Sequence, residues 1–347
     1  MNIRIILFVV VLMSFTLFSC DQKGFFAEKT VVVKKFKSEI ELDPELFTKD
    51  EVYGLDDIIC IDKYVVLSAR TDYLFYVYNI EGDSLGAFGK KGQGPRELLS
   101  GVYCGQFYID GESTFMWIND VSKDKMCAID INKSLLDGEF YIEKTITTIP
   151  RIVNCFYSDD SLLIMERMTR NNYNLLIKNL NSNTIIEDNA IYRYPVEDVF
   201  GIYQSKWRIK PDGTKYVIAM LSINQLNIGG LLNDQKVSIN VYSKMSKLDN
   251  VIDKETDLAK MIYYCGVDVS NNYIYVLYMN QPYEDTFVKE KAMEVHVFSW
   301  NGEAICKFHI PQYITHFAVN ETEGLILGWD FFKEKLFKYK FDVSLFK

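Results

Sequence analysis

Gly86-Ala-Phe-Gly-Lys-Lys-Gly-Gln-Gly-Pro-Arg-Glu-Leu98 closes the first of several units that repeat along the rest of the chain. An apolar, strand-like run ends at Phe88 and leads into spaced glycines, one proline and the charged pair Arg96 and Glu97. Glycine adopts backbone angles that are closed to other residues, and proline fixes its own backbone angle. The stretch is therefore predicted to be a shaped crossing between two sheets. The alternative interpretation is an ordinary tight turn.

Units of roughly 50 residues recur from about Leu55 to the end of the chain, and the crossing closes the first of them. Each unit contains an inner strand, two long strands and an outer strand, joined by turn sequences such as Pro211-Asp212-Gly213 and Asn301-Gly302. A single twisted sheet cannot bury both of its faces, whereas sheets stacked around an axis can. The pattern predicts an all-β fold, a six-bladed β-propeller that occupies residues 30–347 as one domain.

The crossing resembles the Gly-x-Gly-Pro-Gly-Glu-Phe signature of TolB-like six-bladed β-propeller lipoproteins, a family abundant in the Bacteroidetes. Four residues match this signature: Gly92, Gly94, Pro95 and Glu97. Arg96 stands where the family has glycine, and Leu98 stands where it has an aromatic residue. Many family members have no assigned activity, so the resemblance implies an architecture more than a chemistry.

The N-terminus has the pattern of a targeting segment. Arg4 precedes an uncharged, mainly apolar run, Ile5 to Phe18, whose length fits a signal peptide and is short for a spanning helix. The run ends in Leu17-Phe18-Ser19-Cys20, which resembles a bacterial lipobox. Residues 1–20 are interpreted as a lipoprotein signal peptide and residues 21–29 as a tether. This implies lipidation of Cys20 and a place in the cell envelope, facing the periplasm or the cell surface, with the lipid as the only membrane contact. An ordinary secretory peptide is the alternative.

Three further segments are interpreted by their place in the repeat. Thr30 to Leu42 alternates loosely and precedes the first unit, so it is expected to pair with the last blade and close the ring. Ile223–Val237 and Asn280–Ala292 are interpreted as insertions between the middle strands of units four and five. Long loops are more often functional than short ones, although drift in surface loops would give the same pattern. Lys254–Tyr263 has helical spacing and is interpreted as a short connector.

In a propeller, the loops after the second strands share one face with the blade crossings, around the channel. The residues predicted to bind a ligand at this channel mouth are Arg70, Asp72, Arg96, Glu97, Asp120, Arg167, Arg170, Tyr283, Trp329 and Asp330. Arginine matches carboxylate or phosphate groups, and aromatic rings offer flat apolar contacts. The expected partner is an anionic small molecule, a glycan or an envelope protein. The alternative is a solvated rim whose charges pair with each other.

Composition and motifs exclude several functions. The net charge of -9 and the absence of a basic block argue against nucleic-acid binding. No catalytic motif is recognised, so no catalytic residue is predicted, and His316 is the one histidine expected near the channel. The cysteines show no Cys-x-x-Cys spacing, and those of the propeller are interpreted as buried free thiols.

Two function classes remain. The first is a lipid-anchored binding or interaction module without a cofactor. The second is a propeller hydrolase or lyase that uses a divalent cation such as Ca²⁺, similar to the lactonase-like propellers. Its candidate metal ligands would be Asp57, Asn154 and Asp268.

Overall fold

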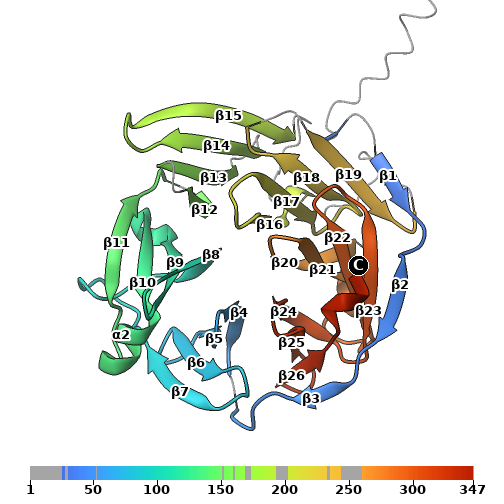
Figure 1. Cartoon of the computed structure of the whole chain (residues 1–347), viewed down its shortest axis with the longest axis horizontal. Helices are drawn as coiled ribbons and strands as arrows, with labels where there is room; N and C mark the ends of the chain where they lie inside the picture. Colours follow the sequence, from blue (N-terminus) through green and yellow to red (C-terminus); the bar gives the residue numbers. More distant parts are fainter. Residues whose placement is uncertain are drawn as a thin grey trace, which may run out of the picture.

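Six β-sheets surround a common axis in the computed structural model, which confirms the predicted six-bladed β-propeller (Figure 1). The described residues are 26–27, 30–51, 53–150, 152–158, 161–168, 173–192, 202–232, 235–243 and 260–346. In that part of the chain, no helix is long and apolar enough to cross a membrane.

The first three blades are four-stranded antiparallel sheets. Blade one consists of β4 (Leu55–Ile61), β5 (Tyr64–Ala69), β6 (Phe75–Asn79) and β7 (Ser84–Phe88). Blade two consists of β8 (Val102–Asp110), β9 (Ser113–Asp120), β10 (Lys125–Asp130) and β11 (Ile142–Thr147), with the short helices η1 (Val121–Lys123) and α2 (Ile131–Asp137). Blade three consists of β12 (Ile152–Ser158), β13 (Leu162–Met168), β14 (Tyr173–Asn179) and β15 (Thr184–Tyr192).

The last three blades each gain a strand from the N-terminal segment. Blade four contains β16 (Ser205–Ile209), β17 (Lys215–Met220), β18 (Leu226–Gly230) and β19 (Lys236–Val241). Blade five contains β20 (Met261–Val269), β21 (Tyr273–Pro282), β22 (Met293–Ser299) and β23 (Ala304–Ile310), with η2 (Tyr283–Asp285) after β21. Blade six contains β24 (Ile314–Asn320), β25 (Leu325–Asp330) and β26 (Lys335–Lys340), followed by η3 (Val343–Phe346).

The core lies between the blades, as β21 illustrates. Tyr275 and Leu277 pack in a cluster with residues of blade six, and the alternate residues Ile274 and Val276 pack in a cluster with residues of blade four. All four are fully buried. Successive side chains of a strand point to opposite faces, so an uninterrupted apolar run suits a sheet that is wedged between two others.

The N-terminal segment forms a strap around the outside of blades four to six (Figure 1). β1 (Thr30–Val33) pairs in parallel with β19, and β2 (Ser38–Glu41) pairs in parallel with β23. β3 (Pro44–Leu46) pairs with β26 and supplies the strand that the last blade lacks. The expectation that Thr30–Leu42 pairs with the last blade was therefore wrong, although an N-terminal strand does close the ring. The strap covers two further sheet edges first, which removes their unpaired backbone groups from solvent.

Blade four also departs from the prediction. Ile223–Val237 is not an insertion, because it contains β18, the third strand. Gly229 lies within this strand and weakens its sequence pattern, because glycine is uncommon in strand interiors. A Cβ at this position would lie 2.5 Å from Cζ of Tyr216, so only glycine fits beneath that ring. Asn280–Ala292 does form a connection between the second and third strands of blade five. Of Lys254–Tyr263, the last three residues begin β20, and residues 254–259 lie outside the described part.

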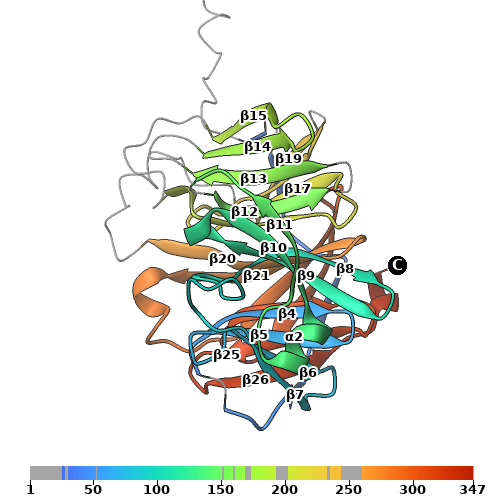
Figure 2. The same ribbon diagram turned by 90° about the vertical axis from the view of Figure 1, so that its left-hand side faces the viewer.

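Helix α2 was not predicted from the sequence. Asp130 caps its start by accepting a hydrogen bond from the Lys133 amide at 3.0 Å, and Gly138 ends it with a φ of 70°. Figure 2 shows α2 on the outside of the ring, and it contacts β7 of blade one. It therefore links two blades beneath the Gly86–Leu98 crossing.

Candidate functional site

The channel opens through two cavities. The cavity of about 1030 Å³ is lined by the first halves of the inner strands and by the crossing after blade one, and we name it the upper mouth. The cavity of about 680 Å³ is lined by the second halves of the inner strands and by the turns after them, and we name it the lower mouth. Three residues line both cavities and mark the waist between them: Tyr103, Arg208 and Phe317.

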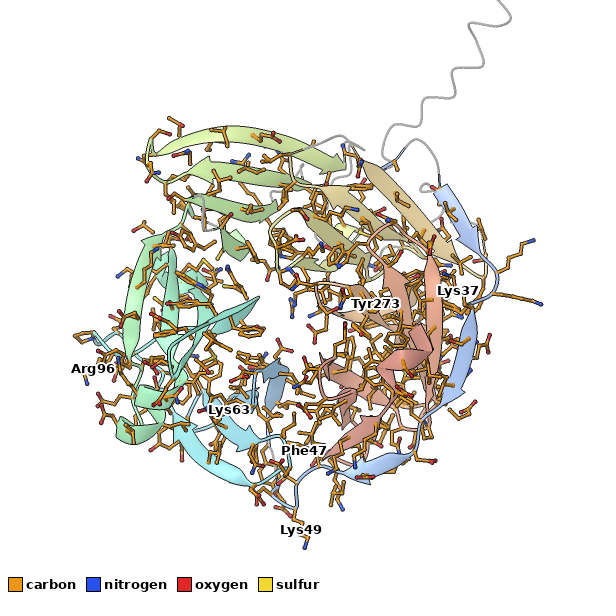
Figure 3. The ribbon with its side chains drawn as sticks, viewed as in Figure 1. Lys37, Phe47, Lys49, Lys63, Arg96 and Tyr273 are labelled. Atoms are coloured by element: carbon orange, nitrogen blue, oxygen red, sulfur yellow. The ribbon has the colours of Figure 1, made fainter. Side chains whose placement is uncertain are left out.

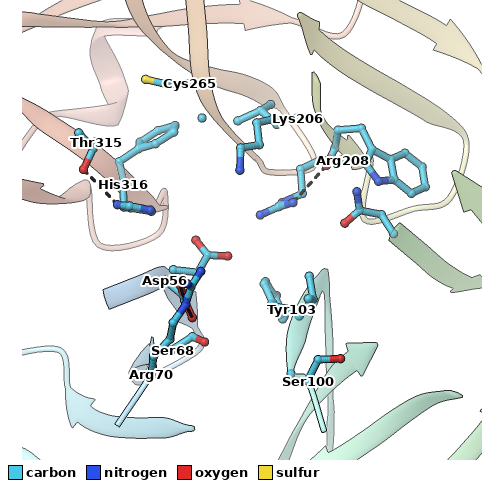
Figure 4. A pocket seen from close by; sticks show the side chains of 18 of the residues that line it. Asp56, Ser68, Arg70, Ser100, Tyr103, Lys206, Arg208, Cys265, Thr315 and His316 are labelled. Carbon is cyan, nitrogen blue, oxygen red and sulfur yellow. Dashed lines mark hydrogen bonds and ion pairs between the residues drawn. The ribbon is translucent and has the colours of Figure 1, made fainter. Parts of the chain in front are cut away.

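Strand β16 supplies the cationic side chains of the upper mouth. Lys206 and Arg208 alternate with Trp207, whose side chain is buried between blades three and four. Strand alternation therefore turns both cations to the channel, and Figure 4 shows them pointing into the same space as His316. Lys206 is exposed and makes no hydrogen bond or ion pair to another described residue. Two positive charges are thus presented to the cavity from one short strand.

Arg208 is the deeper of these two cations. Its Nη1 donates to the Trp207 carbonyl at 3.1 Å, and its Cζ lies 6.0 Å from the centroid of the Tyr103 ring. The Nε atom is buried and has no hydrogen-bond partner among the described residues. The side chain lies against Gly105, where a Cβ would approach Arg208 Cδ to 2.4 Å. Glycine at this position, with a φ of 71°, therefore makes room for the arginine.

Two carboxylates of the upper mouth, Asp56 and Glu166, have hydrogen-bond partners within the chain. Asp56 accepts from Arg70 Nε at 2.7 Å. Glu166 is buried and accepts from the Tyr173 hydroxyl and from Asn154 Nδ2, both at 2.5 Å. Burial raises the pKa of Glu166 above its usual range, and these two hydrogen bonds oppose the shift. Asp57 also lines this cavity, Lys206 opposes the raised pKa of Glu166, and Arg208 opposes that of Asp268. These nearby carboxylates partly compensate both cations, although none of them forms an ion pair with Lys206 or Arg208 in the described part of the chain.

His316 lines the upper mouth, as predicted. Its Nδ1 lies 3.1 Å from the Thr315 hydroxyl. Burial lowers the pKa of His316, and the Asp57 carboxylate partly opposes this. The imidazole is therefore mainly neutral at pH 7, and its ring offers hydrogen-bonding capacity rather than charge.

Two predicted site residues, Glu97 and Asp120, accept hydrogen bonds from backbone amides in and directly after the crossing. Glu97 Oε2 accepts from the Gly94 amide at 2.8 Å, and its carboxylate fills the space above Gly92. Asp120 is fully buried. It accepts from the Leu99 amide at 3.0 Å and from the amide and hydroxyl of Ser100 at 3.2 and 3.1 Å. Gly92 and Gly94 are thus the motif positions against which the Glu97 carboxylate packs, and a side chain at either position would collide with it.

The predicted arginines are held apart by separate partners. Arg70 lines the upper mouth beside Asp56. Arg96 lies at the outer edge of the ring in Figure 3 and pairs with Glu139 at 3.4 Å. Arg167 pairs with Asp188 of the outer strand β15 at 3.1 Å. Asp72 is exposed, and Arg170 lies outside the described residues. Ligand binding by these side chains stays a prediction.

The remaining predicted residues come from blades five and six. Trp329 is buried between blades six and one. Asp330 is fully buried, accepts from the Phe332 and Lys333 amides and pairs with the Lys333 ammonium at 2.9 Å. Tyr283 is 45% exposed and belongs to a chain of exposed apolar residues. The members of this aromatic patch are Tyr283, Phe287, Val288, Phe331 and Phe332.

The candidate metal ligands do not fit a divalent cation. Asp57 and Asn154 line the upper mouth, whereas Asp268 lines the lower mouth. Both oxygens of Asp268 already accept backbone hydrogen bonds, from Val269 at 2.9 Å and from Val319 at 2.8 Å. Burial raises the pKa of Asp268 to about 6, which the nearby Arg208 opposes. Within the described ranges, no three His, Cys, Asp or Glu side chains are grouped to hold a metal ion.

Sequence reasoning missed the two cations of β16 and the buried Glu166. The signal for the first was present in Ser205-Lys-Trp-Arg-Ile209, where two basic residues alternate with apolar ones in a strand that faces the channel. Glu166 carried no such signal, because its role depends on contacts with Asn154 of β12 and Tyr173 of β14.

Comparisons with known proteins agree with this architecture. The model of one family, described as TolB-like 6-blade propeller-like, matches residues 51–322. The chain is similar to the crystal structure of a Bacteroides fragilis protein described as exported, with a TM-score of 0.52 and 14% identity over 86% of this chain and 88% of that one. It is also similar to a duf4221 family member from Bacteroides vulgatus, with a TM-score of 0.56 and 14% identity over 87% of this chain and 98% of that one. No curated protein matches the chain.

Proposed function

The chain belongs to the TolB-like 6-blade propeller-like family, and from the charges of its channel we propose that it is a binding module for an anionic ligand. The upper mouth takes a small molecule or a glycan that carries a carboxylate, phosphate or sulfate group. Arg208 and Lys206 bind the anionic group, and the polar groups of Ser100 and His316 bind hydroxyls of the same ligand.

The single observation that carries this proposal is the pair of cations that β16 turns to the channel. Lys206 has no partner among the described residues, and Arg208 keeps a buried Nε without an acceptor. Leaving a buried donor unsatisfied costs free energy, which an anionic acceptor would recover. Guanidinium groups match carboxylate and phosphate geometry. Four basic and three acidic side chains line this cavity, whereas the whole chain has a net charge of -9.

The size of the cavity favours a ligand larger than a single inorganic anion. Its volume of about 1030 Å³ lies at the upper end of the range of small-molecule sites, about 300–1,000 Å³. Hydroxyl and amide groups of Ser68, Ser100 and Asn154 line the same cavity as the two cations. A short acidic oligosaccharide would fill this volume, and its hydroxyls would bond to these polar groups.

Calorimetric titration of the purified protein tests the proposal with citrate, trigalacturonate and a sulfated heparin disaccharide as probes, and with maltotriose as the uncharged control. At least one anionic probe is expected to bind, and maltotriose is expected to bind much more weakly. Lys206→Met and Arg208→Met should each weaken the anionic probe by about tenfold or more, because each removes a charged hydrogen bond.

Lys63→Met is the matched control. Lys63 is also exposed, but it lines the lower mouth, so removal of its charge should leave the affinity unchanged. The proposal is wrong if none of the three anions binds, or if Lys63→Met weakens binding as much as Lys206→Met does.

We further propose that the protein is anchored in the cell envelope through a lipid on Cys20, facing the periplasm or the cell surface. The support is the sequence Leu17-Phe18-Ser19-Cys20 after an apolar run, together with the likeness to a protein described as exported. Residues 1–25 lie outside the described part of the chain. Cys20→Ala should move the protein from the membrane fraction to the soluble fraction. Retention of that variant in the membrane would refute lipidation as the anchor.

The aromatic patch favours a second candidate function, the docking of an envelope protein. Its five exposed apolar side chains come from two neighbouring blades, and contiguous apolar surface of this kind is typical of protein interfaces. Cross-linking in intact cells, with a photoreactive residue in place of Phe287, should capture a partner. The same residue in place of Leu136, which is 85% exposed on α2, is the matched control. Equal capture at both positions would refute the patch as a docking surface.

A further inference from the structure

Two buried cysteines of neighbouring blades lie in direct contact. Cys104 is in β8 of blade two and Cys155 is in β12 of blade three, 51 residues further along the chain. Their Sγ atoms are 3.7 Å apart. Cys155 is fully buried and Cys104 is 8% exposed. Both belong to the apolar cluster that joins the two blades.

The surroundings of the pair permit a closer approach. A disulfide needs an S–S distance of about 2.05 Å, so the two sulfur atoms must approach by about 1.7 Å from the 3.7 Å seen here. Met126 and Met165 lie in the same cluster. Methionine is unbranched and adapts its shape, so small rotations of the two cysteine side chains can be absorbed without moving either strand far.

We propose that Cys104 and Cys155 form a reversible disulfide that joins blade two to blade three. The oxidant is a disulfide, either of a protein dithiol oxidase or of a small molecule such as oxidised glutathione. One cysteine thiolate attacks the oxidant and forms a mixed disulfide, which releases one oxidant thiolate. The second cysteine thiolate then attacks the mixed disulfide and releases the other. The two cysteines lose two protons and two electrons, and the oxidant is reduced to two thiols.

Burial determines when this reaction occurs. Burial raises the pKa of Cys104 well above its ordinary value, and the neighbouring Cys155 adds to the shift. The thiolate is the attacking species, so the folded protein reacts slowly. The bond therefore forms mainly while the chain folds. Tyr103 and Gly105, on either side of Cys104, line the lower mouth, whereas both cysteines pack in the apolar cluster between blades two and three.

The bond would stabilise a specific part of the channel. The register of β8 against β9 shifts between Tyr103 and Phe107, so Cys104 lies in an irregular stretch of the strand. A covalent link from this stretch to β12 limits its movement and restricts the unfolded chain. The inference does not depend on what the channel binds.

The test is oxidative refolding of the full chain. The protein is unfolded with dithiothreitol, transferred to oxidised glutathione for refolding, alkylated and mapped by mass spectrometry. Two fewer free thiols and a linked peptide pair with Cys104 and Cys155 are expected. The Tm should exceed that of the reduced protein by about 3–8 °C, and dithiothreitol should abolish this difference.

Variants separate this bond from other oxidations. Cys155→Ser should lose both the linked peptide and the Tm difference, whereas Cys306→Ser, which changes a buried cysteine of blade five, should keep both. Should Cys155→Ser fail to fold, Cys104→Ser replaces it, and the peptide map of the unchanged chain decides by itself. The inference is overturned if that chain keeps both thiols, or if the link joins another pair such as Cys104 and Cys127.

Discussion

The crossing Gly86–Leu98 and the inner strand β16 are both near the upper mouth, but their polar groups are satisfied in opposite ways. In the crossing, Glu97 accepts a backbone amide of its own loop, and the carboxylate of Asp120 secures the residues that follow it. In β16, Lys206 and the Nε of Arg208 find no acceptor among the described residues.

This difference separates structural charges from candidate binding charges. A buried polar group that is paired within the chain stabilises the fold and has little left to offer a ligand. A buried donor without a partner, such as Arg208 Nε, is held at a cost, whereas the exposed ammonium of Lys206 is hydrated; both are available to a ligand. The most conspicuous motif of the sequence thus identifies the family and shapes the mouth, whereas a less conspicuous strand supplies its free charges.

The largest effect is expected from Asp120→Ala. The change removes three hydrogen bonds to one buried carboxylate and leaves the backbone amides of Leu99 and Ser100, directly after the crossing, without their acceptor. The free energy of unfolding should fall by about 4 kcal/mol, measured by denaturant titration. The exposed carboxylate of Asp72 gives the control, since Asp72→Ala should change stability by less than about 0.5 kcal/mol. Equal losses for the two variants would contradict the structural role of Asp120.

A pH dependence is expected from Asp268, which lies near Arg208 below the waist. The pKa of this buried carboxyl is raised from 3.8 to about 6, so the folded protein binds more protons than the unfolded chain between these values. The stability contributed by Asp268 is therefore greatest below pH 3.8, falls as the pH rises to about 6 and is constant above it.

The difference in unfolding free energy between the wild type and Asp268→Asn measures this effect. From pH 4 to pH 7 the wild type should lose about 2.4 kcal/mol relative to the variant, because one pKa unit corresponds to about 1.4 kcal/mol and part of the change lies below pH 4. Adding Arg208→Met to both proteins should enlarge the difference, because Arg208 favours the charged carboxylate. A difference independent of pH would show that Asp268 keeps its ordinary pKa.

A smaller effect is expected from Gly92→Ala. A Cβ at this position would lie 2.0 Å from Oε2 of Glu97, so the carboxylate must move and loses its bond to the Gly94 amide. The loss in unfolding free energy should be about 1.5 kcal/mol. Glu97→Ala should cost a similar amount, and the double variant should cost no more than either single variant, since both break the same contact. Additive losses would show that glycine is needed here for another reason.

The smallest effect is expected from Arg96→Ala, because its pair with Glu139 is exposed on both sides. Stability should change by less than about 0.5 kcal/mol, and the affinity for the anionic probe should equal that of the wild type. Lys206→Met, tested alongside, should bind the probe more weakly. A loss of affinity in Arg96→Ala would show that the anionic probe binds at the crossing rather than at β16.

Local patterns in the sequence account for much of this architecture. The strand runs, the Asp-Gly and Asn-Gly turns and the crossing motif each depend on residues close together in the chain, so the repeat and the propeller could be predicted from them. The apolar run of β21 even indicated burial on both faces, because alternation is a property of the strand itself.

What depends on distant partners could not be predicted in this way. Nothing within Thr30–Leu42 specifies that it pairs with β19 and β23, since an edge strand accepts any open edge of suitable length. β18 is a strand because it pairs with both β17 and β19, and its Gly229 leaves room for the Tyr216 ring. In the same way, Arg96 and Lys206 are both simply basic residues in the sequence. Patterns within short segments therefore specify the six-bladed ring and its crossing motif. The pairing of Arg96 with Glu139 and of Arg167 with Asp188 is established only in the folded chain, because the members of these pairs are 43 and 21 residues apart in the sequence.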